Sequence, residues 1–297
     1  MLDGVSGLTA DAPIRTLINT HSDADHIDGN QLLAGAEIVS SRRSAEIIRK
    51  QDPGSFKRFG RLARGMRLVG GLPLPVVGSL PLPVLPRVRL RPIGDYIGDM
   101  LAPFDFGGIE VTPPTREFEG ELSLDVGGRR LRLTEVGPAH TPGDLIVHVP
   151  DAGVVYAGDI LFVGATPVMW AGPVVNWTAA IDTLLALDAD TYVPGHGPVC
   201  GRAEAEAVKR YWVWLEAAAR HRFGLGMSAW EAARDIALSP EFATHEWAAW
   251  SAPERIVINV HTLDRERRGE LGGEASPREL ITIFSRVALL AHELERR

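Results

Sequence analysis

The sequence predicts an α/β protein with a helical C-terminal extension, and three observations support this fold class. Short β-rich runs recur along the first two-thirds of the chain, and a polar residue of the metal-ligand type follows each of them. Two alternating runs around a Gly-Gly step have the pattern of a β-hairpin. From Arg202 onward the chain is rich in Ala, Glu, Leu and Arg, which favour helices.

The β-rich runs have the length of strands, and the Gly and Pro residues beside them are typical of loops. The runs cover residues 14–20, 131–136, 154–158 and 191–195, and they lead into His21, His140, Asp159 and His196. Strand ends at one edge of a sheet are where a rigid scaffold presents site residues. We therefore expect these four side chains to lie near one another.

The other elements follow from local patterns. Residues 36–40 are predicted to form a buried strand, and residues 44–50 form the helix after it. The hairpin is predicted from apolar residues that alternate with polar ones on both sides of the Gly-Gly step, namely Leu122, Leu124, Val126, Leu131 and Leu133. Further helices are predicted over residues 178–187, after an Asn176 cap, and over residues 203–223 and 277–296.

These elements suggest two domains. We predict a metal-binding domain over residues 1–200, with a Pro-rich insertion at about residues 67–115, and a helical extension over residues 201–297. The insertion contains Leu-Pro-Leu-Pro-Val twice, beginning at Leu72 and at Leu80, which is too few copies for a repeat architecture. An extended, polyproline-like backbone is expected there. The segment could be an apolar strap that contacts a partner subunit or covers the active site. A plain surface loop is the other interpretation.

Composition and charge exclude several classes of protein. The net charge of −7 argues against a general nucleic-acid-binding protein, which needs a basic surface. Cys200 is the only cysteine, so no intramolecular disulfide can form and a reducing cytoplasm is the expected location. The first residues lack the basic start and apolar core of a signal peptide. Prolines interrupt the long uncharged run at residues 68–86, which argues against a membrane span.

Four metal-capable side chains lie within six residues directly after the first predicted strand, namely His21, Asp23, Asp25 and His26. Residues two apart in an extended chain point the same way, so His21 and Asp23 can share one metal ion. A turn would then direct Asp25 and His26 toward a second ion. A single His or Asp after a strand is usually a cap or turn residue, but this many in one hexapeptide make chance improbable.

The ligand-type residues that follow the other three strands would complete such a site. They are His140, Asp159 and His196, and Asp159 would bridge the two ions. We therefore predict a dinuclear metal site built from seven side chains.

Four segments resemble the metal-binding motifs of the metallo-β-lactamase superfamily, and they occur in the family's order. They are residues 20–26, 137–144, 157–159 and 193–198. The resemblance spans roughly residues 10 to 200 and implies an αββα sandwich with a dinuclear site at one edge of the paired sheets. It also implies one metal ion held by His21, Asp23 and His140, a second held by Asp25, His26 and His196, and Asp159 as the bridge.

The chain departs from the family pattern at two places. Asp23 stands where the common His-x-His-x-Asp-His motif has its second His. An added carboxylate favours harder ions such as iron or manganese, although zinc remains the first expectation because Asp is a competent zinc ligand. The second departure is that only twenty residues precede His21, where the family usually has several strands. We expect that the first strands are missing, or that another segment or subunit covers the sheet edge.

The predicted function is metal-dependent hydrolysis of a small molecule. A hydroxide bound to the two metal ions would attack an ester, thioester, lactone or amide, and Asp25 would orient it and relay its proton. One alternative is a diiron redox enzyme related to the flavodiiron branch, which Asp23 suggests. Others are a catalytically weak truncated family member or a non-catalytic binding protein. A small-molecule substrate and a homodimer are the expected partners, with no nucleic acid.

Aromatic residues near the predicted site are interpreted as ordinary packing rather than as substrate contacts. They are Trp170, Trp177, Tyr96, Phe104 and Phe106. Basic residues at helical spacing between Lys57 and Arg67 are interpreted as a solvated face rather than an anion site.

Overall fold

The computed structural model describes residue 7 and residues 12–71, 90–272 and 275–297. The chain forms two compact units. The first unit comprises Met1–Gln51, Ile109–Val163 and Met169–Val213, and the second comprises Asp52–Gly108, Gly164–Val168 and Trp214–Arg297.

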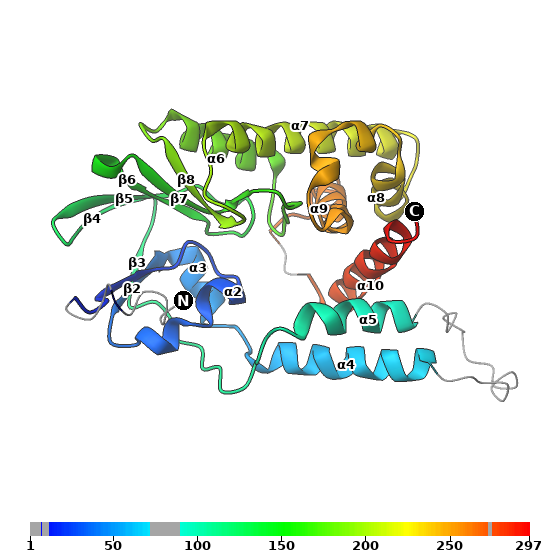
Figure 1. The fold of residues 1–297 in the computed structure, drawn as a ribbon, viewed down its shortest axis with the longest axis horizontal. Helices are drawn as coiled ribbons and strands as arrows, with labels where there is room; N and C mark the ends of the chain where they lie inside the picture. Colours follow the sequence, from blue (N-terminus) through cyan, green and yellow to red (C-terminus); the bar gives the residue numbers. More distant parts are fainter. Residues whose placement is uncertain (1–6, 8–11, 72–89, 273–274) are drawn as a thin grey trace, which may run out of the picture. The chain divides into compact units, whose positions relative to one another are not determined.

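The first unit contains two β-sheets (Figure 1). The smaller sheet is parallel, in the order β1 (Thr16–Ile18), β2 (Glu37–Ser41) and β3 (Arg116–Phe118). The larger sheet follows chain order, with β4 (Glu121–Val126), β5 (Arg129–Glu135), β6 (Leu145–Val149), β7 (Val154–Phe162) and β8 (Thr191–His196). Its neighbouring strands are antiparallel except β7 and β8, which are parallel.

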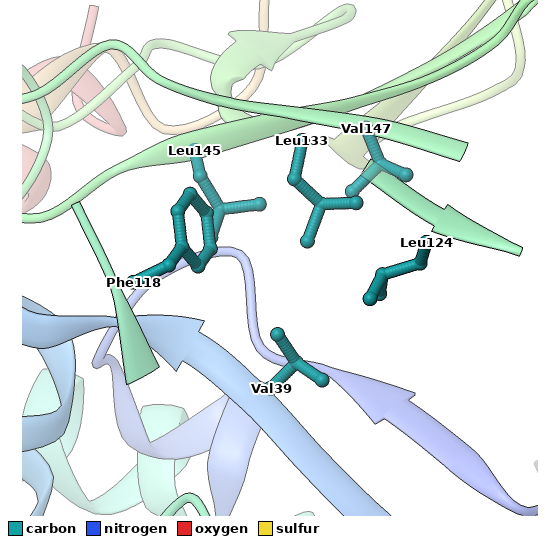
Figure 2. Close-up of a cluster of buried hydrophobic side chains, with 6 residues drawn as sticks. All are labelled: Val39, Phe118, Leu124, Leu133, Leu145 and Val147. Atoms are coloured by element: carbon teal, nitrogen blue, oxygen red, sulfur yellow. The ribbon is translucent and has the colours of Figure 1, made fainter. Parts of the chain in front are cut away.

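The two sheets pack face to face through one apolar core, which Figure 2 shows. Val39 and Phe118 come from the smaller sheet, and the larger sheet contributes Leu124, Leu133, Leu145 and Val147. Leu124 and Leu133 belong to the alternating hairpin, in which every second side chain points to the same face. Burying a side chain of this size stabilises the fold by about 1.5–3 kcal/mol relative to leaving it exposed.

Helices pack on the outer faces of both sheets. α3 (Arg42–Ile48) begins at Ser41, whose hydroxyl accepts a hydrogen bond from the Ser44 N–H, and it contacts β2 and β3. α6 (Val174–Ala186) lies against β7, where the Trp177 indole N–H donates to the carbonyl of Ile160. The Trp212 ring of α7 (Arg202–Gly224) then packs on Trp177 at 4.4 Å between centroids. The first unit is therefore an αββα sandwich, as predicted.

Short helical turns complete the first unit. They are α2 (Ala24–Ile27), η1 (Asn30–Leu33) and η3 (Pro150–Ala152).

The second unit is helical. It contains α4 (Gly54–Gly71), α5 (Leu90–Leu101), the later part of α7, α8 (Ala229–Leu238), α9 (Ile256–Arg267) and α10 (Pro277–Leu294), with η4 (Phe242–Thr244), η5 (Glu246–Ala249) and η6 (Pro253–Arg255). α8 and α10 each begin with a capping box, in which a Ser and the Glu three residues later satisfy each other's backbone N–H groups. Among the described residues, no helix is long and apolar enough to span a membrane.

Most predicted elements are present, and the differences have local causes. The strand at residues 36–40, the helix at 44–50, the hairpin and the two long C-terminal helices are confirmed. The helix predicted to start at residue 178 begins at Val174, with Pro173 in the N-cap position and no side-chain cap. Asn176 therefore lies inside the helix, and its side chain donates to the carbonyl of Pro138. β7 continues to Phe162, so Asp159 lies within the strand rather than after it.

The predicted insertion is more helical than expected, because its described residues include the end of α4 and all of α5, and residues 104–115 contain no helix. The two Leu-Pro-Leu-Pro-Val copies, between Leu72 and Val84, lie outside the described residues. The second unit combines the described insertion up to Gly108 with the C-terminal helices, and the first unit includes the rest of the insertion and continues to Val213. A domain boundary at residues 200–201 stays a prediction.

Candidate metal centre

The loop between β1 and η1 carries four of the seven predicted ligands. His21 and Asp23 precede α2, and Asp23 has the extended backbone of a helix N-cap, with φ −71° and ψ 145°. Asp25 and His26 lie within α2 itself. The change from extended chain to helical turn therefore separates the two pairs, as the spacing predicted.

The larger sheet supplies the other three predicted ligands. His140 lies in the loop between β5 and β6, Asp159 in β7, and His196 at the end of β8. Because β7 and β8 are parallel neighbours, Asp159 and His196 reach the same edge of the sheet.

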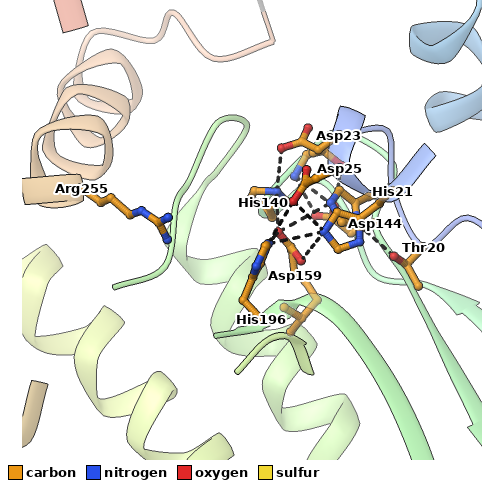
Figure 3. A network of polar contacts seen from close by, with 12 residues as sticks. Thr20, His21, Asp23, Asp25, His140, Asp144, Asp159, His196 and Arg255 are labelled. Atoms are coloured by element: carbon orange, nitrogen blue, oxygen red, sulfur yellow. Dashed lines mark hydrogen bonds and ion pairs between the residues drawn. The ribbon is translucent and has the colours of Figure 1, made fainter. Parts of the chain in front are cut away.

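The Asp159 carboxylate lies at the centre of the cluster, and the side chains around it converge on it in Figure 3. The Nε2 atoms of all four histidines lie close to its oxygens, at 3.7 Å for His21, 3.3 Å for His26, 3.2 Å for His140 and 3.4 Å for His196. Four imidazoles thus present the same ring nitrogen to one buried carboxylate.

The other two aspartates lie beside different histidines of the cluster. Asp23 Oδ2 is 3.1 Å from His140 Nε2. Asp25 Oδ2 is 3.4 Å from both His26 Nε2 and His196 Nε2. All seven predicted site residues are therefore brought together.

Three overlapping groups have ligand atoms close enough to hold a metal ion. The first is His21, Asp23 and His140, the second is Asp25, His26 and His196, and the third joins His21 and His26 to Asp159. These groups have the composition expected for two subsites and a bridge. The role of each residue as a ligand stays a prediction.

The cluster strongly perturbs the pKa values of its members. Burial, followed by the nearby charge of His140, lowers the pKa of His21 to about 3. Burial alone would also lower the pKa of His140, but the carboxylates of Asp23 and Asp159 raise it to about 10. Burial would raise the pKa of Asp159, but hydrogen bonding with His196 and the charge of His140 lower it to about 2. The Asp159 carboxylate is therefore ionised at neutral pH.

The buried atoms of the cluster fit a divalent cation. His21 Nε2 and Asp159 Oδ1 are buried, and neither has a hydrogen-bond partner among the described residues. The other ring nitrogen of His21, Nδ1, lies 3.0 Å from Thr20 Oγ1. If Nδ1–H donates to that hydroxyl, the neutral ring leaves its Nε2 lone pair directed into the cluster. Imidazole nitrogen and carboxylate oxygen are a donor set that zinc and iron both accept.

The sequence did not single out Asp144, which supports the His140 loop. Its carboxylate is buried and accepts hydrogen bonds from the Thr141 N–H at 3.0 Å and from the Thr141 hydroxyl at 2.5 Å. Burial raises the pKa of Asp144 to about 6. Asp144 lies inside one of the recognised motifs, but nothing in its spacing distinguishes a loop-bracing carboxylate from a ligand.

A glycine beside the cluster is required by close approach of the chain. A Cβ atom on Gly195 would lie 1.8 Å from Asp159 Oδ1. The neighbouring Gly197 has a φ of +103°, which side-chain-bearing residues rarely adopt. The close approach at Gly195 and the positive φ at Gly197 explain why glycines flank His196.

Aromatic rings back two of the histidines. The Phe162 ring stacks on His196 at 4.9 Å, and the Trp177 ring lies 6.0 Å from His140, edge-on. Trp177 is fully buried, so the packing interpretation holds for it. Trp170 donates its backbone N–H to the carbonyl of His140.

The remaining aromatic residues that the sequence singled out, Tyr96, Phe104 and Phe106, belong to the helical unit. Their described contacts lie within that unit, with Glu254 for Tyr96 and with Phe56 for Phe106.

Two curated relatives match parts of the chain. A linear primary-alkylsulfatase of Pseudomonas sp. (strain ATCC 19151) is 27% identical over 209 residues, which cover 68% of this chain and 38% of the relative. A protein named as a probable metallo-hydrolase from Bacillus subtilis (strain 168) is 37% identical over 97 residues, covering 31% of this chain and 46% of the relative. The chain thus spans less than half the length of these relatives.

Two solved structures share the fold. The inverting sec-alkylsulfatase Pisa1 from Pseudomonas sp. has a TM-score of 0.57 at 13% identity, covering 94% of this chain and 45% of that chain. A metallo-β-lactamase family protein from Thermus thermophilus has a TM-score of 0.53 at 19% identity, covering 90% of this chain and 81% of that chain. At these identities the similarity concerns the fold alone.

The family model described as the metallo-β-lactamase superfamily matches residues 9–196, which are more than half of the chain and include all seven residues of the cluster. With the αββα sandwich and the motif order, this match shows that the chain belongs to the metallo-β-lactamase superfamily.

Proposed function

We propose that this protein is a metal-dependent hydrolase whose cluster binds two divalent metal ions. The observation that carries the proposal is the Asp159 carboxylate, which lies within 3.2–3.7 Å of four histidine Nε2 atoms. Asp23, beside His140, and Asp25, beside His196, would each supply a further oxygen to one subsite. His21, Asp23 and His140 would hold one ion, Asp25, His26 and His196 the other, and Asp159 would contact both.

When bound, two divalent ions would supply the acidification of a water molecule and the polarisation of the bond to be cleaved. The residues of the chain have separate tasks around that reaction. Thr20 orients the His21 ring, and Asp144 braces the loop that carries His140.

Asp25 is the candidate for proton transfer. Its side chain is 50% exposed, whereas that of Asp159 is 3% exposed, so Asp25 can meet both solvent and substrate. Burial would raise the pKa of Asp25, but hydrogen bonding with His196 and His26 lowers it well below its usual value. The group is therefore a carboxylate at neutral pH, and its oxygens can accept a hydrogen bond from the attacking water and orient it before the proton is relayed.

The proposed substrate is an ester, thioester, lactone or amide of a small molecule. A narrower second candidate is an alkyl sulfate ester, favoured by the relative named as an alkylsulfatase, whose similarity covers 68% of this chain. Zinc is the proposed metal. Asp23 also keeps iron or manganese open, and a diiron redox enzyme remains the alternative.

An assay panel with metal analysis tests this proposal. The purified full chain, reconstituted separately with zinc, manganese and iron, is tested on carboxylic esters, thioesters, lactones, amides and dodecyl sulfate. We expect hydrolysis of one class, with a loss of activity in Asp159→Asn. Asp125→Asn changes an exposed residue that pairs with Arg130 on the hairpin and should match the wild type. No hydrolysis under any metal, or oxygen reduction by the iron form alone, would overturn the proposal.

A further inference from the structure

The loop that carries four of the seven candidate ligands begins and ends at an asparagine. Asn19 follows β1 and precedes His21, and Asn30 opens η1 after His26. Both side chains are buried, with 2% of each residue exposed. Neither residue belongs to the predicted ligand set.

The two side-chain amides form a reciprocal pair of hydrogen bonds. Asn19 Nδ2 donates to Asn30 Oδ1 at 3.0 Å, and Asn30 Nδ2 donates to Asn19 Oδ1 at 3.0 Å. Two antiparallel bonds between planar amides set their orientation as well as their distance. A buried amide without such partners would cost about 1–3 kcal/mol.

A third residue determines which way the pair faces. Asn30 Nδ2 also donates to the backbone carbonyl of Thr112 at 3.0 Å. Turning the Asn30 amide over would place its oxygen against that carbonyl, with two acceptors in contact. The Asn19 backbone N–H donates to the carbonyl of Val39, which ties the pair to β2 as well. The pair is therefore anchored to the smaller sheet and to the segment before β3.

We propose that the Asn19–Asn30 amide pair is a positioning device that closes the ligand loop and holds its two halves at the separation that two metal ions require. This inference rests on the proposed function. His21 and Asp23 lie in the half next to Asn19, while Asp25 and His26 lie in the half next to Asn30. The hydrogen bonds of the two amides go to each other and to Thr112, so the pair acts on metal binding through the backbone of the loop.

The expected size of the effect follows from comparable groups in metal sites. Partners that orient ligands without touching the metal change metal affinity by roughly 10–100-fold when they are removed. Because the pair spans both halves of the loop, affinity for both ions should fall.

Three variants test the pair, namely Asn19→Ala, Asn30→Ala and the double variant. Zinc affinity of the full chain is measured by competition with a chromophoric chelator, and circular dichroism checks folding. We expect each single variant to lose about 10–100-fold in zinc affinity. The double variant should lose no more than the single variant that binds zinc less tightly. Losses that multiply in the double variant would mean independent roles and would overturn the pair.

A fourth variant, Asn30→Asp, separates geometry from charge and remains informative if the alanine variants do not fold. It keeps the size of the side chain but places an oxygen against the acceptors Asn19 Oδ1 and Thr112 O. The added negative charge near the ligand loop would by itself strengthen cation binding. We expect weaker zinc binding, and unchanged or stronger binding would contradict the proposal.

Leu124→Ala is the matched control for lost stability, because it truncates a buried side chain of the first unit that lies in β4, outside the ligand loop. It should destabilise the fold and leave zinc affinity unchanged. Equal losses in this control and in the asparagine variants would overturn the positioning role.

If the wild type itself binds no zinc, iron or manganese, the proposed function fails together with the pair. If the wild type binds metal and the asparagine variants bind it equally well, the pair alone fails.

Discussion

The helical unit and the sheet unit differ in the surroundings of one buried carboxylate each, Glu254 and Asp159. In the helical unit, Tyr96 donates its hydroxyl hydrogen to the buried Glu254 at 2.8 Å, and Arg222 Nε donates to Asp235 at 2.7 Å. In the sheet unit, His21 Nε2 and Asp159 Oδ1 are buried without a hydrogen-bond partner among the described residues. Polar groups that satisfy one another stabilise a fold, whereas buried donors and acceptors that converge without partners are the arrangement expected of a ligand-binding site.

This difference separates structural from functional residues better than residue type does. Glu254 and Asp159 are both buried carboxylates, yet only Asp159 belongs to the groups of candidate metal ligands found in the described part of the chain. Substitutions that disturb the Asp159 cluster should therefore change metal binding, and substitutions in the helical unit should change stability alone.

The largest effect is expected for Gly195→Ala. The new Cβ would lie 1.8 Å from Asp159 Oδ1, so the central carboxylate or the β8 backbone must move. We expect metal affinity to fall by roughly 100-fold or more, measured by chelator competition. Gly201→Ala is the matched control, because its Cβ would meet only Glu204 Oε2, at an ordinary 3.7 Å. Equal affinity in the two variants would show that Asp159 is not central.

Metal uptake should release protons. Asp159 and Asp25 raise the pKa of His196 to about 9, and Asp23 and Asp159 raise that of His140 to about 10, despite its burial. At neutral pH both rings are therefore protonated without metal, and both must lose a proton to ligate it. We expect about two protons released per chain and an affinity that rises with pH. Calorimetry in two buffers of different ionisation enthalpy measures this number, and a value near zero would contradict the ligand assignment.

Tyr96→Phe should act on the helical unit alone. It removes the hydrogen bond to Glu254 and leaves that buried carboxylate with one partner fewer. We expect the free energy of unfolding to fall by about 1–3 kcal/mol in urea denaturation, with metal content unchanged. A change in metal content would contradict the separation of roles between the two units.

The smallest effect is expected for Ser228→Ala. The Ser228 hydroxyl accepts a hydrogen bond from the Glu231 N–H at the start of α8. Losing this cap should lower the unfolding free energy by about 1 kcal/mol, which the same denaturation experiment can resolve. A loss of unfolding free energy larger than that of Tyr96→Phe would contradict the assignment of Ser228 as an ordinary helix cap.

The sequence was most informative where chemistry and local pattern coincide. His21, Asp23, Asp25 and His26 could be recognised because four ligand-type residues follow a single strand. The hairpin could be recognised because its apolar residues alternate. Both signals lie within a few neighbouring residues.

Features that depend on distant contacts could not be predicted. The buried side chain of Asn30 is satisfied by hydrogen bonds with Asn19 and Thr112, and Thr112 is 82 residues away. Gly94 in α5 would be expected to disfavour a helix. Its lack of a side chain instead lets α5 approach α4, because a Cβ atom on Gly94 would lie 2.6 Å from the Ala63 carbonyl oxygen. Nothing in the local sequence marks either residue.

If Asp159 organises a two-metal site, the number of metal ions bound per chain depends on its carboxylate, and native mass spectrometry of the reconstituted chain measures that number directly. We predict two divalent ions per wild-type chain and fewer than two per chain in Asp159→Asn. A wild-type chain without bound metal, or an Asp159→Asn chain that retains both ions, would contradict this role of Asp159.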